Sequence, residues 1–269
     1  MICFPNAKIN LGLNVTEKRR DGYHNIETIF YPIPVKDALE IVPAREFSFS
    51  QTGIAIDGPA EKNLVMKAVN LMKEHFDIPP LDIHLLKAIP FGAGLGGGSA
   101  DAAFMLKLLN DFCSLGQNEK ELEALAASIG ADCPFFIRNK PVFASGTGNI
   151  FTPVNVSLTG YMLCLVKPDI AVSTPEAYSL VKPAFPETGV KEIISRPVSE
   201  WRELLVNDFE ESVFARHPRI EQIKTTMYKT GAAYAAMSGS GSSVFGLFEK
   251  PVSLKENFPD CYVWEGNLP

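Results

Sequence analysis

The chain has 269 residues, of which 46% are hydrophobic and 21% are charged, and its formal net charge at pH 7 is -6. This length suffices for two modest domains, and the composition is that of an ordinary globular protein. The negative charge argues against nucleic-acid and anionic-membrane partners, which require clustered lysine and arginine. Nucleotide binding is not excluded, because backbone amides and a metal ion can supply a local positive field.

The cysteines predict a cytoplasmic protein with reduced thiols. They number five, are scattered through the chain and form no C-x-x-C pair, which argues against a disulfide framework or a zinc site. No pair of His, Cys or carboxylate residues has metal-ligand spacing. The N-terminal residues lack the apolar core of a signal peptide, and no run of about eighteen apolar residues predicts a membrane span.

The first part of the chain mixes strands and helices without strict βαβ alternation, which favours the α+β class. Strands are expected on both sides of the polar turn 18–22, which contains the hairpin signal Asp-Gly, and again at 39–42 and 47–56. Helical spacing of apolar residues predicts a helix at 64–72. Alternation at 81–85 predicts a strand with one solvent-facing side.

The most informative segment is the glycine-rich stretch 92–98, in which five of seven residues are glycine. Glycine lets the backbone adopt positive φ and approach a ligand closely. From residue 99 to residue 113 apolar residues recur at helical spacing, so the stretch opens directly into a helix. A helix start offers unpaired N–H groups and the positive end of a dipole. The segment therefore predicts a phosphate-binding loop.

Two familiar phosphate loops compete with this interpretation. A P-loop requires a lysine after its last glycine, and a serine stands there instead. The pattern Gly92-x-Gly94-x-x-Gly97 matches the dinucleotide fingerprint, which leaves open an oxidoreductase that uses these three glycines. The context argues against it, because the alternating strand 81–85 is not the continuous apolar run of a Rossmann strand.

A second helix is expected after this one, opened by a capping box that starts at Asn118 and closed by Gly130. Asp132 follows on a short turn, and Pro134 biases Cys133 towards an extended conformation. A carboxylate at a helix C-terminus opposes the helix dipole. This unfavourable placement points to a functional role for Asp132.

The remaining chain predicts a small second α+β domain. Turn residues at 146–157 indicate a linker, which divides the chain into an N-terminal domain, 1–152, and a C-terminal domain, 153–269. The proline-rich stretch 168–197 is expected to be a loop with one short helix. The other elements are expected in the order strand, helix, helix, strand, strand, over residues 161–166, 199–212, 218–230, 232–237 and 243–248.

Two further segments place polar groups together. Lys8 and Asn10 lie two residues apart in a strand, so their side chains share one face while Ile9 and Leu11 point the other way. The Gly/Ser loop 238–243 offers free N–H groups that suit an anion or a substrate. Each segment also fits an ordinary structural role, as a solvated strand face and as a hairpin turn.

Taken together, these segments resemble the GHMP kinases. Residues 90–102 resemble the phosphate-binding motif of that superfamily, and residues 8–13 and 237–248 resemble its first and third motifs in the right order. Longer strings are most similar to the family of 4-diphosphocytidyl-2-C-methyl-D-erythritol kinases. These strings are residues 7–11, 21–24, 94–99, 130–134 and 238–241.

The resemblance implies a two-domain GHMP kinase fold, with an N-terminal domain like the ribosomal S5 second domain and a ferredoxin-like C-terminal domain. It implies ATP-dependent phosphorylation of the 2-hydroxyl of 4-diphosphocytidyl-2-C-methyl-D-erythritol in non-mevalonate isoprenoid precursor biosynthesis. The partner is then a small cytidine diphosphate derivative, Mg²⁺ arrives with ATP, and the protein is a monomer or homodimer. A sibling GHMP kinase for a mevalonate- or homoserine-like alcohol and a non-catalytic nucleotide-binding module stay open.

The resemblance also implies roles for individual residues. Asp132 matches the general base and Lys8 its partner, since a carboxylate can accept the alcohol's proton and a neighbouring ammonium keeps that carboxylate ionised. The Ser99 hydroxyl is expected to contact phosphate or Mg²⁺. The expected phosphate-binding residues are Gly92, Gly94, Leu95, Gly96, Gly97, Gly98 and Ser99.

On the acceptor side, the resemblance places Asn10, Tyr23, His24 and Gly239 near the substrate. His24 is expected to read the edge of the cytosine. Tyr178 is expected to stack on the cytosine ring, an interaction worth about 1–3 kcal/mol.

Overall fold

The structure is a computed structural model that describes residues 1–55 and 59–269. The chain divides into two compact units, each made of several stretches. Unit 1 comprises Met1–Ala7, Val35–Phe91 and Gly96–Lys140, and unit 2 comprises Lys8–Pro34, Gly92–Leu95 and Pro141–Pro269. The division of the sequence into domains 1–152 and 153–269 stays a prediction.

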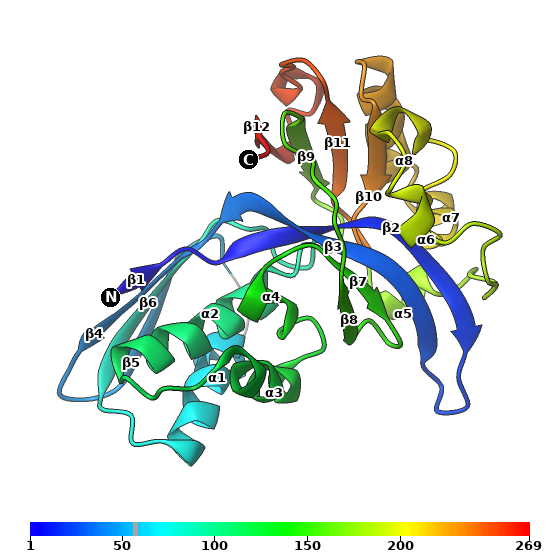
Figure 1. Ribbon diagram of the computed structural model, residues 1–269. Coiled ribbons are helices and arrows are strands. Elements are labelled where there is room, and N and C mark those ends of the chain that lie inside the picture. The colour runs from blue at the N-terminus through cyan, green and yellow to red at the C-terminus, as the bar shows by residue number, and fades with distance from the viewer. Residues whose placement is uncertain (56–58) are drawn as a thin grey trace. The chain divides into compact units, whose positions relative to one another are not determined.

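Unit 1 is built on a four-stranded sheet with the order β1-β4-β6-β5. The two neighbours of β4 run antiparallel to it, whereas β5 runs parallel to β6. Figure 1 shows helices α1, α2 and α3 together beside this sheet. The elements are β1 (Ile2–Cys3), β4 (Ala38–Pro43), β5 (Ser48–Gly53), α1 (Leu64–His75), β6 (Leu81–Lys87), α2 (Gly97–Phe112), α3 (Glu119–Ile129) and α4 (Phe135–Arg138).

Strand β6 shows the predicted alternation, and it leads towards the glycine-rich loop. Leu81, Ile83 and Leu85 are fully buried, while Asp82 and Leu86 are exposed. A strand with one buried face has a well-defined register, because a shift by one residue would turn all of its buried apolar side chains towards solvent. The end of β6 is therefore fixed relative to the core of unit 1.

Helix α3 begins and ends where the sequence predicts. Asn118 and Glu121 form the capping box, and Gly130 is the C-cap residue. Beyond it the structure differs from the expectation for Cys133: the residue lies in a turn, and Pro134 stands in helical conformation at the start of α4. Proline is tolerated at a helix start because its missing N–H has no intrahelical partner there.

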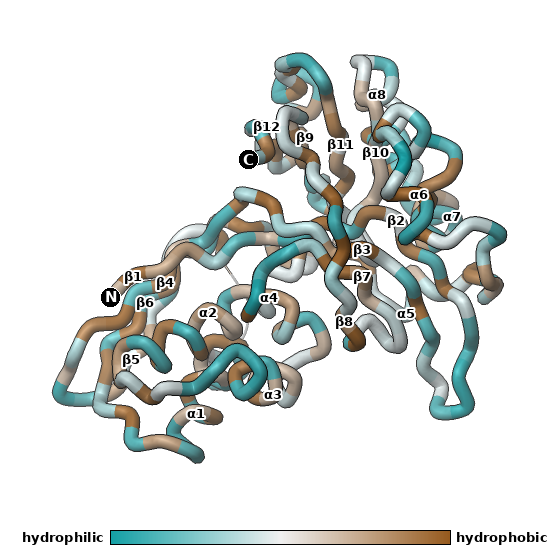
Figure 2. Tube along the Cα trace, in the orientation of Figure 1, coloured by the Kyte–Doolittle hydropathy of each residue, from teal (hydrophilic) through white to brown (hydrophobic). Residues whose placement is uncertain are grey.

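Unit 2 contains two four-stranded sheets, with the orders β2-β3-β7-β8 and β10-β11-β9-β12. The long β2–β3 hairpin begins and ends in residues that count with unit 1, and its far end is hydrophilic (Figure 2). The strands are β2 (Asn6–Lys18), β3 (His24–Lys36), β7 (Val142–Ser145), β8 (Ile150–Pro153), β9 (Met162–Pro168), β10 (Tyr234–Met237), β11 (Val244–Phe248) and β12 (Cys261–Asn267).

One apolar core of unit 2 joins the sheet of β9, β10 and β11 to two helices. It contains residues that alternate along these strands, together with Val213 of α7 and Ile220 and Ile223 of α8. The helices of unit 2 are α5 (Thr174–Ala177), α6 (Val190–Ile193), α7 (Phe209–Arg216) and α8 (Pro218–Lys229). Packing of helices against one face of an antiparallel sheet confirms the predicted α+β class.

Several predicted elements differ from the structure. The expected linker 146–157 contains strand β8, and the expected helix at 199–212 is reduced to a short 3-10 turn, Val198–Glu200, and helix α7. The proline-rich stretch holds two short helices instead of one, and β12 was not predicted. Of the strand expected at 47–56, Ile56 lies outside the described residues.

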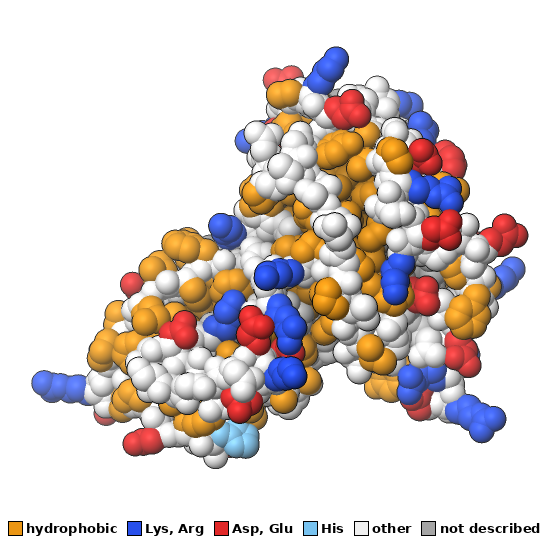
Figure 3. All heavy atoms as spheres, viewed as in Figure 1, with side chains coloured by type: hydrophobic (Ala, Val, Ile, Leu, Met, Phe, Trp, Pro, Cys, Tyr) orange, Lys and Arg blue, Asp and Glu red, His pale blue; other side chains and the backbone are white. Residues whose placement is uncertain are grey.

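The charged side chains on the surface are of both signs, as the composition leads one to expect. Acidic and basic side chains are interspersed on the face drawn in Figure 3. Within residues 1–55 and 59–269, no helix is long and apolar enough to cross a membrane.

Candidate active site

The glycine-rich loop adopts the backbone conformation for which glycine is required. Gly92, Gly94 and Gly96 have φ angles of 61°, 73° and 69°, a region that other residues rarely enter. Gly96 is the N-cap residue of α2, and the helix begins at Gly97. The N–H groups of this first helical turn have no intrahelical partner, so they can bind an anion.

The loop is packed tightly on one side and open on the other. In its unit 2 half, a Cβ on Gly94 would lie 1.9 Å from the Ser238 carbonyl oxygen, whereas a Cβ on Gly92 would meet no described heavy atom within 4 Å. In its unit 1 half, a Cβ on Gly97 would lie 2.8 Å from Ile89 Cγ2, whereas one on Gly98 would make only ordinary contact. Gly94 and Gly97 are thus required by close packing, whereas a Cβ at Gly92 would meet open space.

Lys8 is held by a buried polar network in unit 2. Its Nζ donates to Asn10 Oδ1 at 2.6 Å and to the Gly94 carbonyl at 3.2 Å. The ammonium also lies 4.7 Å from the centroid of the Phe30 ring. Asn10 Nδ2 donates to Thr28 Oγ1 at 3.0 Å. The side chains of Lys8 and Asn10 thus share one face of β2, as their spacing predicts.

The Gly/Ser loop between β10 and β11 belongs to the same network. Ser238 Oγ accepts the Asn10 N–H at 3.2 Å and donates to the Gly94 carbonyl at 2.9 Å. Asn207 Nδ2 donates to the carbonyls of Met237 and Gly239, at 2.8 and 2.9 Å. The structure therefore brings Lys8, Asn10, Gly94 and Gly239 together in unit 2.

Asp132 lies half-buried in the turn between α3 and α4 of unit 1. The neighbouring Cys133 is fully buried and forms a hydrogen bond with the Ser99 side chain of α2. This bond ties the turn that carries Asp132 to the first turn of the helix that follows the glycine-rich loop. Lys8 belongs to unit 2, so the pairing of Asp132 with Lys8 stays a prediction.

Burial shifts two pKa values near the start of α2. It raises the pKa of the Cys133 thiol to about 11, although the hydrogen bond with Ser99 opposes the shift. It raises the pKa of the Asp101 carboxyl to about 7, an effect that Lys87 opposes and Asp37 reinforces. Cys133 is therefore a protonated thiol at neutral pH, the form of cysteine that is a poor nucleophile.

Two of the residues expected on the acceptor side are in contact. The rings of His24 and Tyr178 are stacked, with centroids 4.6 Å apart and planes inclined by 21°. Phe209 packs edge-on against Tyr178 at 4.6 Å. Tyr23 lies at the hairpin turn and is 68% exposed, so its ring is presented to solvent beside His24.

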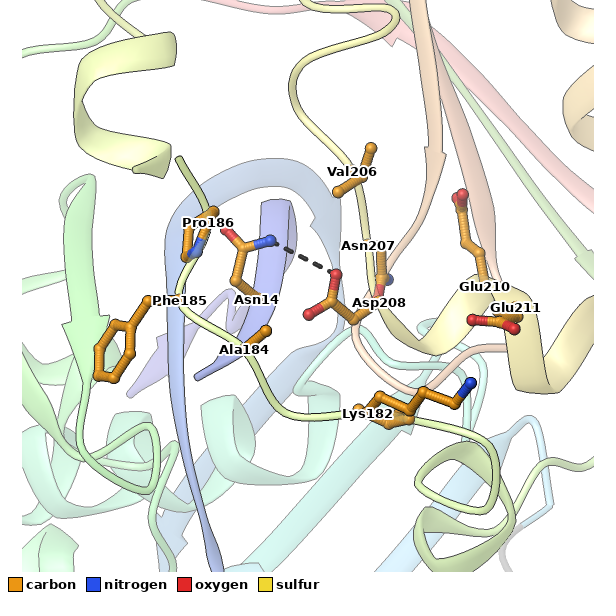
Figure 4. Close-up of a pocket in the computed structure, with 11 residues that line it drawn as sticks. Asn14, Lys182, Ala184, Phe185, Pro186, Val206, Asn207, Asp208, Glu210 and Glu211 are labelled. Atoms are coloured by element: carbon orange, nitrogen blue, oxygen red, sulfur yellow. Dashed lines mark hydrogen bonds between the residues drawn. The ribbon is translucent and has the colours of Figure 1, made fainter. Parts of the chain in front are cut away.

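Unit 2 also contains a cavity of about 490 Å³ that includes none of the predicted site residues. Asn14 and Asp208 point into it and are hydrogen-bonded to each other (Figure 4). Asp208 also accepts the Val15 N–H at 2.7 Å. Because these polar groups hold β2 against the segment before α7, we assign them a structural role.

The described residues contain no metal site made of protein side chains alone. Among residues 1–55 and 59–269, no group of three His, Cys, Asp or Glu side chains could hold a metal ion. Mg²⁺ in phosphoryl-transfer sites is commonly held by one or two protein groups together with the substrate phosphates. The hydroxyl of Ser99, the residue expected to contact Mg²⁺, is an oxygen donor of that kind.

Comparison with known proteins identifies the family. Residues 63–140 match the GHMP kinases N terminal domain, and residues 190–259 match the GHMP kinases C terminal domain. A 4-diphosphocytidyl-2-C-methyl-D-erythritol kinase of Parabacteroides distasonis is 73% identical over 270 residues, covering 100% of both chains. The chain belongs to the 4-diphosphocytidyl-2-C-methyl-D-erythritol kinases.

Solved structures agree with this membership. A crystal structure of 4-(cytidine 5'-diphospho)-2C-methyl-D-erythritol kinase matches with a TM-score of 0.86 and 32% identity, covering 100% of this chain and 99% of that one. The Methanococcus jannaschii mevalonate kinase matches with a TM-score of 0.74 and 15% identity, covering 100% and 98%, which shows a shared fold alone. The predicted GHMP kinase fold is confirmed, and the oxidoreductase alternative is set aside.

Sequence reasoning missed two supports of this kinase site. Thr28 of β3 accepts the Asn10 amide, and Asn207 fixes the loop that carries Gly239. In the sequence each stands beside an acidic residue, Glu27 or Asp208, so no apolar pattern marks it as buried. Its hydrogen-bond partners lie far away along the chain.

We expect Gly94→Ala to lower the free energy of unfolding by about 3 kcal/mol or more, because the backbone conformation is strained and the added Cβ overlaps the Ser238 carbonyl. Gly116→Ala is the matched control: its φ is 70° and a Cβ there meets no described atom within 4 Å. It should cost only about 1–2 kcal/mol. Urea denaturation of both variants measures the difference, and equal losses would contradict the close packing of Gly94.

We expect the thiol of Cys133 to resist iodoacetamide at pH 7.5 in the folded protein, because burial both shields it and keeps it protonated. Cys113 should be alkylated faster under the same conditions because it is partly exposed, although burial raises its pKa as well. Mass spectrometry of tryptic peptides gives the extent of modification, with the urea-unfolded protein as the fully reactive control. Alkylation of Cys133 at the rate seen in urea would refute its buried, protonated state.

Proposed function

We propose that this chain catalyses the ATP-dependent phosphorylation of the 2-hydroxyl of 4-diphosphocytidyl-2-C-methyl-D-erythritol, a step in non-mevalonate isoprenoid precursor biosynthesis. The observation that carries the proposal is a relative named as a kinase of this alcohol, 73% identical over the whole of both chains. ATP as co-substrate follows from membership of a kinase family. A reaction of two small molecules also agrees with the acidic net charge.

The ATP phosphates are proposed to lie along the glycine-rich loop. Gly92 leaves open space beside the loop, and the N–H groups at the start of α2 supply donors for phosphate oxygens. The loop needs no lysine of its own, because the helix dipole and backbone amides favour the negative charge. Expected phosphate-binding residues are those of the predicted set, Gly92, Gly94, Leu95, Gly96, Gly97, Gly98 and Ser99.

Mg²⁺ is proposed to be held by the phosphates with the Ser99 hydroxyl. When bound, it neutralises charge on the phosphate oxygens. The hydroxyl of Ser99 already forms a hydrogen bond with the Cys133 thiol, which fixes its orientation at the start of α2.

Asp132 is proposed to accept the proton of the substrate 2-hydroxyl. The oxygen of that hydroxyl bonds to the γ-phosphorus of ATP, and the bond between the γ-phosphorus and the departing ADP oxygen breaks. A positioned carboxylate is suited to this role at neutral pH. Lys8 is proposed as its charged partner. The network around Lys8, with Asn10, Gly94 and Phe30, supports the role because it holds the ammonium in one place, and fixed charges stabilise a transition state without reorganisation.

The cytosine is proposed to stack on Tyr178 and to be read by His24. Rings 4.6 Å apart leave no room for a base between them. The His24 side chain therefore has to swing aside from Tyr178 when the base binds. Tyr23, which is exposed, is proposed to contact the substrate as well, together with Asn10 and Gly239.

The location of the reaction follows from its co-substrate. We place the enzyme in the cytoplasm, where ATP is supplied. We propose that it works as a monomer or as a homodimer, as the resemblance to the family implies.

The substrate assignment predicts ADP release that depends on 4-diphosphocytidyl-2-C-methyl-D-erythritol. With ATP and Mg²⁺, turnover should occur with this alcohol and be absent with mevalonate, homoserine and galactose. A coupled assay for ADP makes the comparison under identical conditions. Turnover with mevalonate or homoserine instead would transfer the chain to a sibling activity of the GHMP kinases.

The roles of Asp132 and Lys8 predict a loss in the chemical step. Asp132→Asn and Lys8→Met should each lower kcat at least about a hundredfold while the affinity for ATP changes little. Steady-state kinetics gives kcat, and calorimetric titration with a nonhydrolysable ATP analogue gives the affinity. A loss confined to ATP binding would contradict both roles.

A further inference from the structure

A buried ion cluster in unit 1 joins three segments of the chain. Lys87 Nζ donates to Asp101 Oδ2 at 2.8 Å and to Asp37 Oδ2. Lys87 is 1% exposed, and each aspartate is 2% exposed. Asp37 connects β3 to β4, Lys87 ends β6, and Asp101 lies in the second turn of α2.

The cluster clamps both ends of the glycine-rich loop. Asp37 Oδ1 accepts the N–H groups of Ala88 and Ile89, at 2.6 and 2.8 Å, which are the first residues after β6. Through Asp101, the same cluster holds the helix that follows the loop. The strand before the loop and the helix after it are therefore joined by one lysine side chain.

The fit between the cluster and the helix is close. A Cβ on Gly97, the first residue of α2, would lie 3.0 Å from Lys87 Nζ. The ammonium thus lies close to the first residue of the helix. A shift of Lys87 would be transmitted to the first turn of α2, because closely packed interiors do not absorb displacements.

The cluster is poorly composed for stability alone. Two carboxylates share one ammonium, and Asp101 Oδ1 has no hydrogen-bond partner among the described residues. A buried carboxylate that is not fully compensated costs free energy. Such departures from good packing concentrate at functional sites.

We propose that Asp101, acting through Lys87, is a positioning residue that holds the glycine-rich loop and the first turn of α2 in the conformation that receives the phosphates of ATP. The inference rests on the proposed function in one respect, namely that the loop binds the nucleotide. It adds a group that does not itself touch ATP but sets the affinity for it. The identity of the acceptor alcohol does not enter.

Asp101→Ala tests the role, because it frees α2 from Lys87 and leaves Lys87 and Asp37 as a one-to-one ion pair. The dissociation constant for a nonhydrolysable ATP analogue should rise at least about tenfold, as expected for a misplaced binding group. At saturating ATP, kcat should stay within about twofold and the KM for the alcohol should be unchanged. The melting temperature should fall only slightly, because removal of the second buried carboxylate partly offsets the lost hydrogen bond to Lys87.

Asp101→Asn is the conservative variant. Its amide oxygen can still accept from Lys87, so the dissociation constant should return to within about threefold of the original value. Lys224→Met is the matched control in unit 2, where Lys224 Nζ binds the buried Glu210 at 2.6 Å. It should lower the melting temperature and leave nucleotide affinity unchanged.

The proposal is overturned if Asp101→Ala binds the analogue as tightly as the unaltered protein, or if it lowers kcat with the affinity unchanged. Failure of Asp101→Asn to restore binding would also overturn it. Calorimetry requires no acceptor, so a negative substrate assay leaves this result intact. Absence of analogue binding by the unaltered protein would remove the proposed function and this inference together.

Discussion

The carbonyl group of Gly94 is the point on which the candidate site depends. Its oxygen accepts hydrogen bonds from both Lys8 and Ser238, and the missing Cβ lets the Ser238 backbone approach. Lys8 and Asn10 are in turn oriented by these bonds. The backbone of Gly94 packs against Ser238, whereas a Cβ at Gly92 would meet no described atom within 4 Å. The loop is therefore accessible to a ligand at Gly92.

The elements that the sequence predicts correctly are those with strong local signals. The Asp-Gly turn predicts the β2–β3 hairpin, alternation predicts β6, and the capping box at Asn118 predicts the start of α3. Local sequence signals do not predict the elements that depend on tertiary contacts. Strand β8 has four residues after a Gly-rich turn, too few to show a period, and it is defined by pairing with β7. Strand β12 likewise depends on its antiparallel pairing with β9.

The candidate site divides in the same way. Alternation along β2 predicts that Lys8 and Asn10 share a face, and their hydrogen bond confirms it. The alternation of β6 also places Lys87 on the buried face, so the burial of this lysine can be predicted from the sequence. Asn207 could not be predicted, because its partners Met237 and Gly239 lie 30 and 32 residues further along the chain.

Polar side chains pack around this loop where apolar ones would give more stability. Lys8, Asn10, Thr28 and Ser238 are each at most 4% exposed, and desolvating them costs free energy that their mutual hydrogen bonds offset. An apolar core at the same place would leave the Gly94 carbonyl without its side-chain donors, and the loop would lose its fixed conformation. A loop ordered before binding loses less entropy when the phosphates arrive. The buried network therefore supports the proposal that this loop binds the phosphates of ATP.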